Sequence, residues 1–127
     1  ALLQAGEHEE AVIHLLRSIS LNPNSPDNYT SQSMLAYAHY FLGRYDAALA
    51  WANQSILSNP NFAQVYGIRT ATLAQLDRND EAKGALQDFN RVFPDRTISR
   101  LRPNYRWKNA ADIDHFMEGL RKAGLPE

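Results

Sequence analysis

Cysteine is absent from the 127-residue chain, and the sequence contains no long hydrophobic run. Without cysteine there can be no disulfide framework, no thiolate zinc site and no cysteine nucleophile. Apolar runs such as residues 47–52 are six residues long, whereas a membrane-spanning helix needs roughly 18. No basic and then apolar leader begins at Ala1. We therefore expect a cytoplasmic segment that does not insert into a membrane.

An excess of charge of either sign is also missing, since 13 basic and 14 acidic residues leave a formal charge of −1. Binding of a polyanion would therefore require local clustering of basic residues. The six glycines do not form a phosphate-binding loop, and no serine or threonine lies in a nucleophile motif. Acidic pairs such as Glu9 and Glu10 fall in a predicted helix, where they complement the helix dipole. We expect no enzyme activity and no cofactor for this segment.

A glycine or aspartate, an alanine and a proline recur together three times along the chain. The alanine lies five residues after the first member and twelve before the proline, and successive sets are 37 and 34 residues apart. The sets are Gly6, Ala11 and Pro23; Gly43, Ala48 and Pro60; and Asp77, Ala82 and Pro94. This fixed register predicts a structural repeat of 34 positions.

Each of these residues has a physical role in an antiparallel pair of helices. Gly43 follows a helical run and can adopt the left-handed conformation that ends a helix. Ala48, early in the next helix, is small enough for two helix backbones to approach closely. Pro60 lacks an amide hydrogen and ends the second helix. The repeat therefore predicts helical hairpins that stack side by side.

This pattern resembles the tetratricopeptide repeat, a helix pair with a turn glycine, a small residue early in the second helix and a closing proline. A larger apolar residue one turn after the small one completes the pattern, and here it is Leu15, Ala52 or Leu86. The resemblance implies an all-α solenoid, in which the helix pairs stack into a short right-handed superhelix of about two and a half repeats.

The repeats are expected over residues 1–94, as a partial copy at 1–25 and copies at 29–62 and 63–94. In the partial copy, Leu2–Gln4 would be the last turn of the first helix. The third copy departs from the pattern, because Arg69 stands where the family usually has leucine and Asp77 replaces the turn glycine.

Residues 95–127 lack the repeat and are expected to form a C-terminal helical cap. Four apolar residues at helical spacing predict a helix over residues 110–123 that covers the end of the third copy. They are Ile113, Phe116, Met117 and Leu120. Gly124 would end this helix in the left-handed conformation.

The segment Phe116-Met117-Glu118-Gly119-Leu120-Arg121-Lys122-Ala123-Gly124-Leu125-Pro126-Glu127 resembles the C-terminal end of tetratricopeptide regions in bacterial class III adenylate or guanylate cyclases of the rhizobial type. Related tails end repeat proteins that carry a winged-helix regulatory domain. Because the chain starts at Ala1 rather than at methionine, we expect it to be a piece of a longer protein. The resemblance implies an upstream cyclase domain and a bacterial signalling role.

The family resemblance also implies protein–protein interaction, with the inner helices lining a groove for a peptide or helix. The implied groove residues are Thr30, Ser33, Tyr37, Tyr40, Phe41, Gln64, Gly67, Ala71, Ala74 and Gln75. This aromatic, neutral set lacks the Lys and Asn residues by which chaperone-binding members hold a terminal carboxylate, and it suits apolar anchors. Alternatively, Tyr40 and Phe41 only pack between helices. The partner would be a separate protein or the upstream domains of the same chain.

Residues 91–108 hold six basic side chains against one acidic, a net charge of +5. The candidate basic patch consists of Arg96, Arg100, Arg102, Arg106 and Lys108. Three interpretations remain open: the arginines pair with acidic faces of the preceding helices while Tyr105 and Trp107 fill the end of the solenoid, an acidic protein binds here, or nucleic acid does. We favour the first and least expect nucleic acid.

Two further expectations concern histidines and the first helix. His8 and His14 are six residues apart, about 240° around a helix, and so cannot share a zinc ion. His115 is expected to face solvent. The face of the first helix that contains Val12, Leu15 and Leu16 would lack its partner, so we expect self-association through this helix, with an oligomerisation module as an alternative function.

Overall fold

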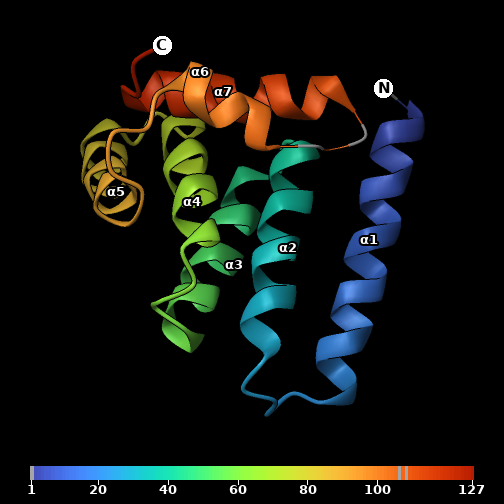
Figure 1. Ribbon diagram of the computed structural model, residues 1–127. Coiled ribbons are helices and arrows are strands. Elements are labelled where there is room, and N and C mark those ends of the chain that lie inside the picture. The colour runs from blue at the N-terminus through green and yellow to red at the C-terminus, as the bar shows by residue number, and fades with distance from the viewer. Residues whose placement is uncertain (1, 106, 108) are drawn as a thin grey trace.

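The computed structural model describes residues 2–105, 107 and 109–127. This part of the chain forms seven α-helices and one short 3-10 helix and contains no strand (Figure 1). The elements are α1 (Leu2–Leu21), α2 (Asn28–Phe41), α3 (Tyr45–Ser58), α4 (Gln64–Gln75), α5 (Asn79–Val92), α6 (Ile98–Leu101), η1 (Arg102–Asn104) and α7 (Ala110–Ala123). The predicted all-α helical-repeat fold is confirmed. Within these residues no helix is both long and apolar enough to span a membrane.

The two hairpin turns are closed by equivalent pairs of backbone hydrogen bonds. At the first turn, the amides of Gly43 and Arg44 donate to the carbonyls of Tyr40 and His39 over 2.9 and 2.8 Å. At the second turn, 34 positions later, the corresponding distances are 3.0 and 3.1 Å. Asp77 adopts the left-handed conformation there with φ of 58°, as Gly43 does with φ of 76°. An aspartate tolerates this conformation better than most residues, so the departure from glycine leaves the turn intact.

The turn expected at Gly6 does not form, because α1 runs without interruption from Leu2 to Leu21. Continuing α1 through Gly6 keeps one backbone hydrogen bond per residue. This gain outweighs the cost of about 1 kcal/mol for a glycine inside a helix.

Small residues set the distance between the paired helices. Ala48 and Ala52 of α3 are fully buried, and they pack in one cluster with Ala36 of α2. Because a methyl group is the only side chain at each position, the two backbones approach closely, as the alanine landmark predicted. Tyr40 and Phe89 are the large side chains that fill the core nearby, and both are almost fully buried.

Helix α7 crosses the array from α1 to α5 (Figure 1). Phe116, Met117 and Leu120 are fully buried, and Ile113 is half-buried. The apolar stripe is therefore covered by the third copy, chiefly by its first helix α4 and much less by its second helix α5. The reason is steric, since α4 presents small residues to α7, and Gly119 of α7 lies directly against Ala71.

Substituting Gly119 tests this close approach. A Cβ atom there would lie 2.7 Å from the Cβ atom of Ala71 and would also collide with the Tyr40 hydroxyl. We expect Gly119→Ala to lower the free energy of unfolding by about 1–3 kcal/mol, measured by urea denaturation. The control is Gly84→Ala on the exposed side of α5, where an added Cβ meets nothing within 4 Å. That change should raise stability by about 0.5–1 kcal/mol, and equal midpoints for the two variants would contradict the packing.

Candidate functional site

The C-terminal helix covers half of the predicted groove. Tyr40 is buried under α7, where its hydroxyl donates to the His115 carbonyl over 2.5 Å and accepts from Gln75 over 3.1 Å. Gly67 lies beneath Phe116, since a Cβ atom on it would be 3.1 Å from that ring. The predicted groove residues on this half are Tyr40, Gly67, Ala71, Ala74 and Gln75. They bind the chain's own helix in this structure.

The other half of the groove remains open as a pocket of about 760 Å³ between α1, α2 and the segment after α5. Five predicted groove residues line it: Thr30, Ser33, Tyr37, Phe41 and Gln64. Sequence reasoning did not place the other lining residues in the groove; these are His8, Ala11, Leu15, Met34, Ala38, Phe62, Phe93, Arg96, Leu101, Asn104, Tyr105 and Trp107. The lining residues from Arg96 onward lie in a segment without a repeat, so no register could assign them.

An aromatic cluster forms one wall of the pocket. The Trp107 ring packs edge-on against Tyr37 and Phe41 of α2, at centroid distances of 5.5 and 5.1 Å. Tyr105 lies 4.9 Å from the same indole. These residues therefore cover the inner face of α2, whereas we expected them to fill the end of the solenoid. Such ring pairs add about 0.5–1.5 kcal/mol each beyond simple burial.

Tyr37 also gives the pocket wall a fixed polar group. Its hydroxyl donates to the Gln64 carbonyl over 3.0 Å, which ties α2 to the start of α4. Burial raises the pKa of Tyr37 well above its usual value of 10.0, and the nearby Tyr105 raises it further. The phenol therefore stays protonated and keeps donating this hydrogen bond at neutral pH.

The three described members of the candidate basic patch have different neighbours. Arg102 pairs with Asp114 of α7, not with a preceding helix, and Arg100 donates to the Asp95 carbonyl over 3.0 Å. Arg96 alone lines the pocket, stacked over the Phe93 ring at 5.4 Å. No acidic side chain among the described residues is within ion-pair distance of Arg96. The remaining two members, Arg106 and Lys108, lie outside the described residues.

Two histidines join α7 to the repeats, and the expectation that His115 faces solvent is wrong. Its ring is half-buried, lies 4.3 Å from the Tyr40 ring, and makes a 2.8 Å hydrogen bond with the Tyr45 hydroxyl. The ring of His8 in α1 is 3.0 Å from the Asp112 carboxylate of α7. Burial lowers the pKa of His115 below 6.5, against the opposing effect of Glu118 and Asp112.

This lowered pKa predicts that acid destabilises the protein. Below about pH 6.5 the unfolded chain binds a proton that folded His115 binds more weakly, so stability decreases as the pH falls. The pKa of His39 is lowered as well, again chiefly by burial, and acts in the same direction. We expect the free energy of unfolding to fall from about pH 8 to about pH 5, and to fall less in His115→Asn.

The exposed His14 provides the control for this measurement. His14→Asn should keep the pH dependence of the wild type. Identical pH profiles for His115→Asn and the wild type would contradict the assignment of the effect to His115.

The first helix is better covered than we expected. Val12 is only 7% exposed and Leu15 is half-buried, because both pack against Leu35 and Ala38 of α2. The exposed apolar face instead contains Leu16, 42% exposed, and Ile13, 54% exposed.

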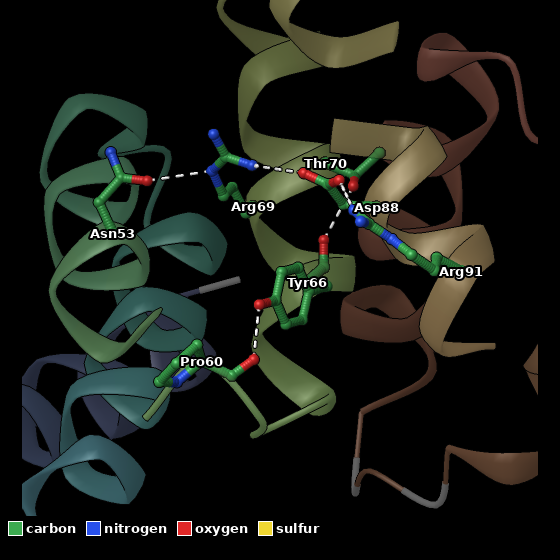
Figure 2. A network of polar contacts seen from close by, with 7 residues as sticks. All are labelled: Asn53, Pro60, Tyr66, Arg69, Thr70, Asp88 and Arg91. Carbon is green, nitrogen blue, oxygen red and sulfur yellow. Dashed lines mark hydrogen bonds and ion pairs between the residues drawn. The ribbon is translucent and has the colours of Figure 1, made fainter. Parts of the chain in front are cut away.

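A polar network between α3, α4 and α5 explains why Arg69 departs from the family's usual leucine (Figure 2). Its Nε atom donates to Asn53 of α3 over 3.0 Å, and its Nη1 atom lies 3.7 Å from the Asp88 carboxylate of α5. Asp88 also pairs with Arg91. The leucine usual in the family could only pack at this position, whereas Arg69 of α4 contacts both α3 and α5. We therefore interpret this region as structural rather than ligand-binding.

Stacked helical hairpins with an apolar pocket on the inner face are typical of helical-repeat proteins that bind other proteins. The family model of the tetratricopeptide repeat matches residues 2–72, and the chain belongs to this family. Tetratricopeptide repeats generally mediate protein–protein interaction and are typically not enzymes. No curated protein and no solved structure matches the chain. Within the described residues, no group of three or more His, Asp or Glu side chains could hold a metal ion.

Proposed function

We propose that this chain binds a protein or peptide partner in the open pocket between α1, α2 and the segment after α5. The supporting observation is the pocket itself: about 760 Å³ on the inner face of a tetratricopeptide array, lined mainly by apolar and aromatic side chains. Pockets of this size and composition bind ligands by burying apolar groups. Met34 adds a flexible apolar side chain that is 53% exposed at the wall.

The pocket favours a partner with an apolar anchor and a neighbouring carboxylate. The rings of Phe41 and Trp107 offer a surface to an aliphatic or aromatic group. Arg96 offers a guanidinium without an acidic partner among the described residues, so an acidic residue of the ligand would find a cation at the same wall. Nucleic acid is disfavoured, because Arg102 is paired with Asp114 and Arg100 is bonded to a backbone carbonyl.

Selection of binding peptides from a displayed random library tests this function. We expect the enriched peptides to combine apolar with acidic residues, and Arg96→Gln to weaken their binding about five- to tenfold, the effect of losing one charged contact. Arg17→Gln on the exposed side of α1 is the matched control and should have no effect. If no enriched peptide binds more weakly to Arg96→Gln than to the wild type, the result would count against the function.

We further propose that the chain is the C-terminal regulatory or interaction module of a larger cytoplasmic signalling protein in a bacterium, such as a class III nucleotidyl cyclase. The resemblance of residues 110–127 to the end of such tetratricopeptide regions supports this proposal. The partner could then be the catalytic domain of the same polypeptide. The coding sequence upstream of Ala1 tests the proposal, since a cyclase domain with its metal-binding aspartates should be found there.

Self-association through α1 is a separate proposal that rests on Ile13 and Leu16. Two large apolar side chains at helical spacing, 54% and 42% exposed, form a face that association would remove from water. We expect sedimentation to show a dimer at high concentration and Leu16→Ser to shift it toward monomer. Leu57→Ser, 78% exposed on α3, is the control and should not alter the equilibrium. A wild-type monomer at every concentration would refute the proposal.

A further inference from the structure

Two hydrogen-bond donors in the pocket wall have no acceptor among the described residues. They are the guanidinium of Arg96 and the hydroxyl of Tyr105, and both belong to the segment after α5. Phe93 and Asn104 of the same segment line the pocket beside them. This end of the pocket is therefore formed without any residue of the first helix.

Arg96 is oriented by an aromatic ring instead of a carboxylate. Its guanidinium lies over the Phe93 ring at 5.4 Å from the centroid, and the residue is half-buried. Other arginines in the described part of the chain pair with carboxylates, as Arg44 does with Glu9. A ring attracts the charge but does not engage the N–H donors as a carboxylate would. Arg96 therefore keeps N–H donors for an anion in the pocket.

The Tyr105 ring is held on two sides by other aromatic rings. Trp107 lies 4.9 Å away, and Phe116 of α7 meets the ring edge-on at 5.2 Å. The backbone is fixed as well, since the Tyr105 amide donates to the Arg102 carbonyl over 3.2 Å at the end of η1. The hydroxyl oxygen is therefore in place before any ligand arrives, which lowers the entropic cost of binding.

The charge of Arg96 acts on the Tyr105 hydroxyl. Burial raises the pKa of Tyr105 above its usual value of 10.0, and Arg96 opposes this rise. The phenol is therefore protonated at neutral pH and can donate a hydrogen bond beside a positive charge. A carboxylate has two oxygens that can accept from both donors, and its charge strengthens both bonds. An amide has one acceptor oxygen and no charge.

We propose that Arg96 and Tyr105 form a carboxylate subsite, which binds one acidic side chain of the partner. This inference rests on the proposed function, and it makes Tyr105 a residue that determines specificity for an acidic side chain over its amide. Because the Tyr105 ring contacts Trp107, the carboxylate would lie beside the apolar anchor that packs on Trp107 and Phe41. The partner should therefore carry its acidic residue close to its anchor.

Peptides from the random library, prepared with an amidated C-terminus, provide the test. Replacing the acidic residue of such a peptide by the corresponding amide should weaken its binding to the wild type about tenfold, because charged hydrogen bonds are lost. Tyr105→Phe keeps the ring and removes only the hydroxyl. This variant should bind the acidic peptide about fivefold more weakly and reduce the acid-to-amide affinity ratio to about two.

Tyr37→Phe is the matched control, since the Tyr37 hydroxyl belongs to a residue of the same pocket but already donates to the Gln64 carbonyl. Its acid-to-amide ratio should equal that of the wild type. An unchanged ratio in Tyr105→Phe would overturn the proposal, as would binding that requires a free C-terminus on the peptide.

A pair of small molecules separates this inference from the proposed function. The probes are 3-phenylpropanoate and its amide, 3-phenylpropanamide, which have the same shape and differ in charge. We expect the acid to shift the nuclear magnetic resonance of the Trp107 indole N–H at lower concentration than the amide does, and this difference to shrink in Tyr105→Phe. The Trp51 indole, which does not line the pocket, is the internal control.

Each combination of results assigns the failure to one proposal or to both. If Arg96→Gln weakens the peptides but Tyr105→Phe leaves the acid-to-amide ratio unchanged, the function stands and the carboxylate subsite is wrong. If no peptide is enriched but the small acid binds through Tyr105, the function fails and the subsite stands. If neither the peptides nor the small acid binds at about 10 mM, both fail.

Discussion

The contact of Gly119 with Ala71 and the Tyr40 hydroxyl holds α7 on the inner face of the repeats. Any side chain larger than a hydrogen atom at residue 119 would separate the two helices, and the buried rings of Phe116 and Tyr40 would lose their neighbours. The division of the inner face follows from this one contact. One half is filled by α7, and the other half is left as a pocket against α1 and α2.

The local parts of the fold could be predicted from the sequence, because local residues determine them. The turn at Gly43 depends on the backbone conformation of a single residue. Asp77 occupies the equivalent position 34 residues later, so the repeat predicts the same turn there. The sequence predicted that α7 covers the third copy, but not that it lies on the inner face of α4, because Gly119, Ala71 and Tyr40 are distant in the sequence and only their shapes bring them together. Half of the candidate groove was lost to α7 for the same reason, although each of its residues lies on an inner helix.

Charge and protonation link α7 to the repeats more than the sequence indicated. The nearly neutral composition concealed specific pairs: Asp112 of α7 with His8 of α1, and Asp114 of α7 with Arg102 of η1, outside the repeats. Removing His115 from solvent costs its protonated form free energy, so acid weakens the attachment that the small residues create. Packing and protonation therefore act on the same helix, and a change in either alters how firmly the inner face is covered.

Because α7 covers most of α4, a ligand in the pocket would contact the inner helix α2 and only the first residue of α4, Gln64. A longer open array divides affinity among many shallow contacts along its ligand, whereas this short surface must obtain it from a few deep ones. Recognition would then depend on the shape of one or two anchor groups rather than on the length of the bound segment. Such a surface would discriminate among partners by the fit of an anchor, since one buried methylene contributes about 0.8 kcal/mol, roughly a fourfold change in affinity.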